Sequence, residues 1–411
     1  MFRDYLFQVS RFSRPSRLFL MAEAFYGVGQ SAVWVLRGLY LKKAGFSESE
    51  IGQTLSVSAA GMALVVLLLP PLMDRRRLRP FQLAAVAALA GGLAGVAWVR
   101  ERPLVLAMCF LSGLGSALLE VSSAPFFMRH SEGEERPYLF GVSTALSPAA
   151  GLLATLGMKA GALAWGEILG AYRDMLWVAA GITLVAWLPL MAVRETPPEP
   201  APRKEAPFDW STAARFCVPE LLFGLGAGLT IPFINLYFNV RFGVPAGTIG
   251  LYYSFAQALM MGAFLMAPLL ARRLGAVRTI VCFQLASIPF FLALAFTTSL
   301  PFAVATFLLR HACMNMVHPV STNFMMEVMN PGQRARMSGL RQTANKLAWV
   351  VATWAGGRMI EHAPFMLDGF TTVMLVTIVF YVAGSALYWR FLRGEAEGRV
   401  IPPGAEPTSG A

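Results

Sequence analysis

The chain has 411 residues, of which 56% are hydrophobic and only 14% are charged. Its mean hydropathy of +0.57 lies well above that of an ordinary soluble domain, which excludes a soluble enzyme. The formal net charge of +11 would indicate nucleic acid or an anionic surface as the partner of a soluble chain. In a membrane protein the placement of the charges matters more than their sum.

Apolar runs of about 20 residues recur along the whole chain, and each is long enough to cross a hydrocarbon core of about 30 Å as a helix. Continuous runs of this kind exclude a transmembrane β-barrel, whose strands alternate in polarity. The sequence therefore predicts an all-α membrane protein with twelve transmembrane helices. The predicted spans are residues 18–40, 50–73, 81–99, 104–128, 138–164, 172–193, 214–238, 246–271, 277–297, 301–326, 336–360 and 369–391.

A polar stretch divides these spans into two sets of six. Residues 194–210, RETPPEPAPRKEAPFDW, are rich in Pro and charge, which predicts a flexible cytoplasmic linker over residues 194–213. We therefore expect an N-terminal six-helix bundle at residues 1–193, a C-terminal six-helix bundle at residues 214–393 and a flexible tail at residues 394–411.

Lysine and arginine are unevenly distributed between the predicted loops. If the N-terminus lies in the cytoplasm, 22 of the 34 fall on the cytoplasmic side and 7 on the opposite side. The positive-inside rule therefore predicts a multi-pass protein of the cell inner membrane with both termini in the cytoplasm.

The two sets of spans are related by an internal repeat. A shift of 197 residues aligns the pattern F-x-x-x-E-x-x-x-G-x-G at residues 19–29 with the same pattern at residues 216–226. With one more residue of shift, Ile51-Gly52 meets Ile249-Gly250, and Arg136 meets Arg334. The chain is thus predicted to be a duplicated six-helix unit, in two pseudo-symmetric bundles of the same orientation.

Twelve spans, a parallel 6+6 duplication and a charged central loop resemble the major facilitator superfamily of secondary transporters. The loop between spans 2 and 3, LPPLMDRRRLR at residues 69–79, is similar to the family's G-x-L-x-D-R-x-G-R-R-x-R, with Pro70 in place of the first Gly. The resemblance implies that Asp74 and Arg75 act at a cytoplasmic gate.

Span 5 carries SPAAG at residues 147–151, which is similar to the G-P-x-x-G-G core of the family's proton-coupled exporters. Ser147 replaces the first Gly of that core and Leu152 its last. The resemblance implies an efflux antiporter. Span 4 has Cys109 where the family usually has a proton-linked Arg, so that role is not carried over.

Polar side chains inside the spans are costly unless they pair or face water, so they are candidates for the substrate site. Span 1 carries a polar stripe at three- and four-residue spacing that is predicted to face a cavity. The deepest cations, in spans 10 and 11, indicate an anionic group on the substrate or a bridge to Glu120 in the other half. The predicted substrate-binding residues are Tyr26, Gln30, Trp34 and Arg37 of the stripe, the cations Arg310 and Lys346, and Asn235, Tyr253, Gln257, His311, Asn315, Asn345 and Trp349.

A second set of residues is predicted to handle the proton and the gate. A shift of 198 residues pairs Glu120 in span 4 with His318 in span 10. An acid that faces a histidine can share and pass a proton, so we assign proton coupling to this pair, with a fixed packing pair as the alternative. Glu23 and Glu220 are repeat-related and lie about a turn inside the cytoplasmic ends of spans 1 and 7, so we expect them to act symmetrically in gating.

The sequence thus predicts a monomeric secondary active transporter that works by alternating access and exports an amphipathic small molecule in exchange for protons. An anion is one candidate for that molecule. Proton-coupled uptake of an organic anion, lipid or lysolipid flipping, and a non-transporting membrane sensor are the alternatives. The sequence has no metal-ligand spacing, phosphate-binding Gly loop or nucleophile–base pair. We therefore expect no enzymatic activity, and no cofactor, metal or nucleic acid. The expected partners are the substrate, protons and the lipid bilayer.

Overall fold

The computed structural model describes residues 11–73, 76–131, 136–166, 168–195, 208–329, 333–363 and 367–397. Every regular element within these residues is helical, which confirms the predicted all-α class. Ten helical segments among them are long and apolar enough to cross a membrane. Two further long helices occupy the positions of predicted spans 8 and 11, and the second of these is rich in arginine and lysine.

The first half of the chain forms the first six predicted spans. Its elements are α2 (Arg14–Ser31), a π-helical segment (Ala32–Leu36), α3 (Arg37–Lys43), α4 (Glu48–Leu68), α5 (Pro70–Met73), α6 (Arg79–Trp98), α7 (Arg102–His130), α8 (Arg136–Trp165), α9 (Leu169–Val185) and α10 (Trp187–Ala192).

The second half forms the other six spans. Its elements are α11 (Trp210–Thr230), a 3-10 segment (Ile231–Phe233), α12 (Ile234–Phe242), α13 (Ala246–Leu274), α14 (Ala276–Phe296), α15 (Leu300–Val328), α16 (Arg334–His362) and α17 (Gly369–Glu397). The predicted domain boundaries stay a prediction, since linker residues 196–207 and tail residues 398–411 lie outside the described residues.

Local sequence accounts for where several helices begin and end. Ser47 and Glu50 form a capping box at the start of α4, which satisfies free backbone N–H groups. Proline stands in the first turn of α2, α6, α7 and α15, where its missing N–H costs nothing. Gly243 ends α12 with φ of 65°, a left-handed conformation that glycine adopts readily.

The internal repeat is visible in the irregular segments. The first span of each half is interrupted, by the π-helical segment at residues 32–36 and by the 3-10 segment at residues 231–233, which the shift of 197 residues superposes on each other. Pro232 explains the second interruption, because it lacks a backbone donor. Asn235 Nδ2, two residues after the second interruption, donates to the carbonyl oxygen of Val35 in the first at 3.0 Å, so the two regions meet across the halves.

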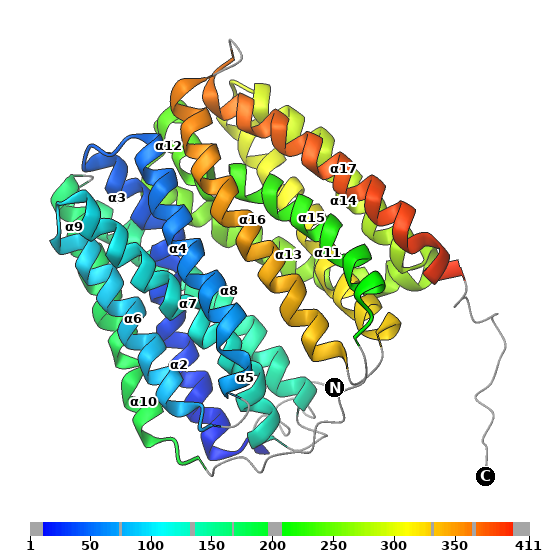
Figure 1. Ribbon diagram of the computed structural model, residues 1–411. Helices are drawn as coiled ribbons and strands as arrows, with labels where there is room; N and C mark the ends of the chain where they lie inside the picture. Colours follow the sequence, from blue (N-terminus) through cyan, green and yellow to red (C-terminus); the bar gives the residue numbers. More distant parts are fainter. Residues whose placement is uncertain are drawn as a thin grey trace.

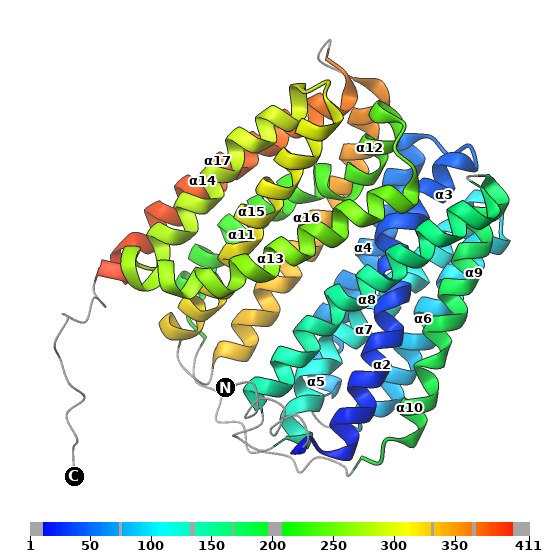
Figure 2. The same cartoon turned by 180° about the vertical axis from the view of Figure 1, so that it is seen from behind.

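The two halves are two bundles that converge at the end of the molecule holding α3 and α12 and diverge toward the end that holds the start of α2 and the end of α17 (Figures 1 and 2). At the converging end α4 packs against α16, and α8 against α13. Thr155 and Ser254 share a hydrogen bond of 2.8 Å there, and Ser56 Oγ donates to the carbonyl oxygen of Val350 at 2.6 Å. In this conformation the converging end is therefore closed.

Glycines allow the closest approach between the halves. A Cβ on Gly52 would lie 2.7 Å from the carbonyl oxygen of Thr353, and one on Gly357 would lie 2.5 Å from that of Glu48. Glu361, at the end of α16, accepts hydrogen bonds from Ser47 Oγ at 2.7 Å and from the Ser49 amide at 2.9 Å. Small residues thus bring the α4 and α16 backbones together, as they do between membrane helices generally.

Candidate functional site

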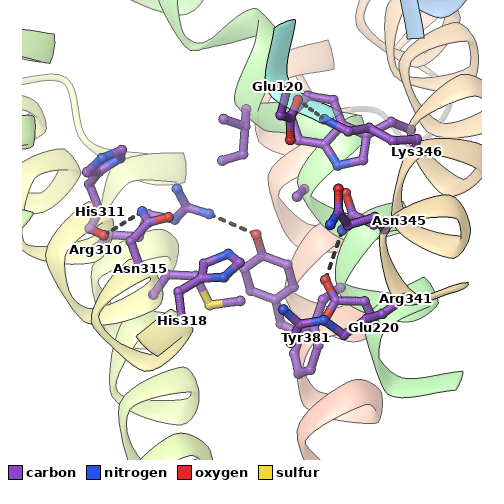
Figure 3. Close-up of a pocket in the computed structure, with 16 residues that line it drawn as sticks. Glu120, Glu220, Arg310, His311, Asn315, His318, Arg341, Asn345, Lys346 and Tyr381 are labelled. Carbon is purple, nitrogen blue, oxygen red and sulfur yellow. Dashed lines mark hydrogen bonds and ion pairs between the residues drawn. The ribbon is translucent and has the colours of Figure 1, made fainter. Parts of the chain in front are cut away.

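A cavity of about 360 Å³ lies between the two halves, largely within the second (Figure 3). Helices α11, α15, α16 and α17, with the 3-10 segment, supply fifteen of its sixteen lining residues, and α7 supplies one. The lining residues are Glu120, Glu220, Phe223, Ala227, Ile231, Arg310, His311, Met314, Asn315, His318, Arg341, Gln342, Asn345, Lys346, Trp349 and Tyr381. Charged groups therefore share this space with aromatic and aliphatic surface.

An ion pair joins the two halves at this cavity. Lys346 Nζ lies 3.4 Å from Glu120 Oε2, and the side chains are 20% and 50% exposed. Of the two roles that the sequence left open for the deep cations, the bridge to Glu120 is the one that Lys346 adopts. Because the pair is partly exposed, its own contribution to stability is small.

Arg310 is the buried cation of the site. Its side chain is 3% exposed, Nη2 donates to the Tyr381 hydroxyl at 2.8 Å, and the guanidinium carbon lies 4.8 Å from the centre of the Phe291 ring. Aromatic rings partly offset the burial of the charge. No carboxylate among the described residues forms an ion pair with Arg310. The guanidinium is thus a buried positive charge that an anion could neutralise.

The remaining polar groups are held mainly by neutral partners. Glu220 Oε1 accepts a hydrogen bond from Asn345 Nδ2 at 3.1 Å, and Arg341 donates to the hydroxyls of Ser321 and Thr322 at 3.3 and 3.1 Å. His318 lines the same cavity as Glu220 and Arg341. Three cations against two carboxylates leave the cavity with one excess positive charge when its histidines are neutral.

The structure brings nine of the predicted site residues together in this cavity. Both residues of the predicted proton pair are among them, but Glu120 bonds to Lys346 rather than to His318. The nine are Glu120, Glu220, Arg310, His311, Asn315, His318, Asn345, Lys346 and Trp349.

The polar stripe of span 1 lies elsewhere. Tyr26 donates to a backbone carbonyl of α7 at 2.8 Å, and Gln30 accepts from Ser116 Oγ at 2.9 Å. Arg37 is 3% exposed and donates to Ser112 Oγ at 3.0 Å. Three of the four stripe residues therefore bond to α7 inside the first half, and none of the four lines the cavity.

The other predicted substrate residues surround the cavity without lining it. The ring of Trp34 meets that of Trp349 edge to face, with 5.8 Å between centroids, so the stripe reaches the cavity through one aromatic contact. Asn235 is 1% exposed and bonds to the backbone of the first half. Tyr253 packs against an aromatic ring of α15, and Gln257 Oε1 is buried with no partner among the described residues.

The predicted gating residues fall into three settings. Glu23 Oε2 accepts a hydrogen bond of 2.7 Å from Ser143 Oγ on α8. Glu23 lies five residues beyond the predicted start of span 1, about 8 Å along the helix. Glu220 lines the cavity, and Asp74 and Arg75 lie outside the described residues.

Seven lining residues were not among the predicted site residues, and the sequence gives no signal for Tyr381 and Phe223 among them. Tyr381 is one aromatic residue in the apolar run of α17, and its bond to Arg310 depends on α14, which packs against both α15 and α17. Phe223 is likewise an ordinary apolar residue of α11. Arg341 could have been included in the predicted site, because it is a cation inside a predicted span. Within the described residues no group of three metal-binding side chains occurs.

Solved transporter structures share this fold. A bacterial homologue of the human lysosomal transporter Spinster, in an inward-facing and occupied conformation, matches with a TM-score of 0.74 and 14% identity over 92% of this chain and 96% of that chain. A D-xylose–proton symporter matches with a TM-score of 0.72 and 14% identity over 94% and 98% of the two chains. The nucleoside transporter NupG matches with a TM-score of 0.70 and 14% identity over 92% of this chain and 98% of that chain. No curated protein matches the sequence.

The sequence also matches a family of transporters along nearly its whole length. The Major Facilitator Superfamily matches residues 19–353 and again residues 216–409. The two matches begin at residues that the internal repeat aligns with each other. With its all-helical fold and its central charged cavity, the chain belongs to the Major Facilitator Superfamily and is a multi-pass membrane transporter rather than an enzyme.

Proposed function

We propose that this transporter carries an amphipathic organic anion, couples its movement to protons and works as a monomer by alternating access. The buried guanidinium of Arg310, which has no carboxylate partner among the described residues, is the observation that supports an anion. Phe223, Ile231 and Trp349 line the same cavity and suit an apolar part of the substrate. A single negative charge would balance the excess charge of the cavity.

The conformation fits one step of this cycle. With both termini in the cytoplasm, as the distribution of Lys and Arg favours, the closed end faces away from the cytoplasm and the cavity belongs to an inward-facing state. The Spinster homologue, whose structure is described as inward-facing and occupied, has a similar fold. We therefore assign the cavity to the site that receives substrate on the cytoplasmic side or releases it there.

The bridge between Lys346 and Glu120 favours symport among the modes of coupling. An anion that binds Lys346 takes the counter-ion away from Glu120, and a carboxylate without its counter-ion binds a proton more tightly. Anion and proton then bind together, and His318 in the same cavity can relay the proton. This arrangement supports proton-driven uptake, which the sequence left as an alternative.

Export by antiport is the second candidate, because α8 carries the SPAAG segment at residues 147–151. The same helix forms part of the closed end through its contact with α13. In an antiporter the anion and the proton would occupy the site in turn rather than together. The direction of the driving proton gradient therefore separates the two candidates.

The test uses the purified protein in proteoliposomes with an imposed pH gradient and 2-naphthalenesulfonate as probe. This amphipathic sulfonate stays a monoanion, so it does not leak across the membrane as a neutral acid. Symport predicts accumulation when the outside is acidic, and antiport predicts accumulation when the inside is acidic. Absence of both binding and flux would overturn the anion assignment, and binding without flux under either gradient would indicate a sensor.

The proton role of Glu120 has its own variant. Glu120→Gln is expected to abolish gradient-driven uptake while sparing exchange of the probe across the membrane. Glu101→Gln, which removes an exposed carboxylate at the start of the same helix, is the matched control and keeps gradient-driven uptake. Unchanged pH dependence in Glu120→Gln would remove this residue from the coupling step.

A further inference from the structure

The first half contains a carboxylate at membrane depth that has no role in the proton coupling proposed above. Glu23 lies in the middle of α2, and its Oε2 accepts a hydrogen bond of 2.7 Å from Ser143 Oγ on α8. The hydroxyl of Ser123 on α7 lies beside the same carboxyl group. Both neighbours are neutral hydroxyls, and Ser123 Oγ itself donates to the Leu119 carbonyl at 2.7 Å.

No cation compensates Glu23 within the described part of the chain. Helices α6, α7, α8, α9 and α10 pack against α2, and none of their described charged side chains forms an ion pair with it. Lys159 is exposed and lies sixteen residues after Ser143, about 24 Å along α8. The others engage other partners: Arg79 bonds the Met191 carbonyl, Arg102 pairs with Glu50, Glu120 pairs with Lys346, Arg129 bonds the Met73 carbonyl, His130 bonds the Phe126 carbonyl and Arg173 pairs with Asp174.

The internal repeat supplies a comparison inside the same molecule. Glu220 is the repeat mate of Glu23 and also accepts a hydrogen bond from the fifth helix of its half, here from Asn345 of α16. The shift of 198 residues places Arg341 where the first half has Ser143. Glu220 therefore shares its cavity with a guanidinium, whereas Glu23 has a hydroxyl at the equivalent position.

An ionised carboxylate at membrane depth with only hydroxyl donors is unfavourable, whereas the protonated form is neutral and keeps the hydrogen bond. We infer that Glu23 is a second proton-binding site, separate from Glu120, and that two protons accompany each anion. This inference rests on the proposed function for its role in transport, but the protonation of Glu23 follows from its surroundings alone.

The hydrogen bond links the proton to the gate. Helix α8, which carries Ser143, also forms the closed end through the bond between Thr155 and Ser254. Rocking of the halves moves α8 relative to its partners, so water reaches the carboxyl group from one side of the membrane at a time. In symport the carboxylate takes up its proton from the outside in the outward-facing state and releases it as hydronium to the cytoplasm in the inward-facing state, so the proton balance closes over one cycle.

The first test needs no substrate. Infrared spectra of the protein in lipid bilayers at pH 7 are expected to contain a carbonyl band of a protonated carboxyl group that Glu23→Gln removes. Glu23→Asp keeps a shifted band, which also covers the case in which the Gln variant does not fold. Glu220→Gln is the matched control and leaves the band in place. A spectrum of folded Glu23→Gln identical to the wild type in this region would overturn the inference.

The second test reads the charge that moves with the anion. One monoanion with two protons carries one net positive charge, so uptake of 2-naphthalenesulfonate by the wild type is expected to produce a current on a solid-supported membrane. Glu23→Gln should retain uptake under a pH gradient with no net current. Electroneutral uptake by the wild type, or an unchanged current per anion in the variant, would overturn the second proton. If the wild type shows no uptake at all, the proposed function fails and the infrared band still decides the state of Glu23.

Discussion

Lys346 of α16 and Glu120 of α7 form an ion pair between the two halves of the transporter, with 3.4 Å between Nζ and Oε2. Both side chains line the cavity, and Glu120 is the one lining residue that the first half contributes within the described part of the chain. In the proposed transport cycle, substrate binding and the contact between the halves therefore meet at Lys346.

Breaking this pair from either side is expected to have opposite effects on the affinity for 2-naphthalenesulfonate. Glu120→Gln frees Lys346 and should lower the Kd, while Lys346→Met should raise it. Because the pair is half exposed on the Glu120 side, each change should be about two- to fivefold, measured by calorimetry in detergent. Changes in the same direction in both variants would mean that the anion does not compete with Glu120.

Arg310 is expected to depend on the shape of its guanidinium as well as on its charge. Lysine keeps the charge but loses the stacking on Phe291 and the fixed fork that bonds Tyr381, so Arg310→Lys should raise the Kd for the probe about tenfold or more. Arg358→Lys is the matched control, since Arg358 stacks on Trp354 outside the cavity. Equal affinities for the wild type and Arg310→Lys would place the anion elsewhere.

Gly357→Ala is expected to open the closed end. The added Cβ would lie 2.5 Å from the carbonyl oxygen of Glu48 and 2.8 Å from Gly52 Cα, and such overpacking costs about 1–3 kcal/mol. The distance distribution between spin labels on the start of α4 and the end of α16 should therefore shift to longer distances, because the closed end opens in a larger share of the molecules.

The matched control for this substitution lies on the same helix. A Cβ on Gly339 meets nothing within 4 Å, so Gly339→Ala adds the same helix propensity without the clash. Its distance distribution should equal that of the wild type. An unchanged distribution in Gly357→Ala would show that the α4–α16 contact does not hold the end shut.

Acid is expected to weaken the same closed end through Glu361, which lies one residue beyond predicted span 11. Hydrogen bonds from the Ser47 hydroxyl and the Ser49 amide lower the pKa of Glu361 below its ordinary value of 4.5. Because the pKa of Glu361 is lowered in the closed form, the ionised carboxylate stabilises that form at any pH above the ordinary pKa. This stabilisation is lost as the pH falls through the lowered pKa. The spin-label distances should thus be constant between pH 8 and 6 and lengthen in strong acid.

Glu361→Gln should remove this acid response. Asp174→Asn is a suitable control, because Asp174 is an exposed carboxylate that pairs with Arg173 of its own helix, and this variant should keep the response. A transition near neutral pH in the wild type would assign the effect to another group.

The sequence by itself predicted the architecture closely. A helix that crosses a bilayer must satisfy its own backbone hydrogen bonds and be apolar over a fixed length, so the positions of the spans could be read from apolar runs. The repeat aligned Arg136 with Arg334, and α8 and α16 begin at these two residues, each two residues before the predicted start of its span. The charges inside the spans were also identified, because each departs from an apolar background.

Only the tertiary structure decided which of these groups meet. The spacing of Tyr26, Gln30 and Arg37 places them on related faces of one span, but that face packs against α7 and not against the cavity. Likewise Lys346 bonds to Glu120, a residue more than 200 positions away. Periodicity fixes which side chains share a helix face, whereas the packing of twelve helices determines what that face contacts, and the substrate site depends on those contacts.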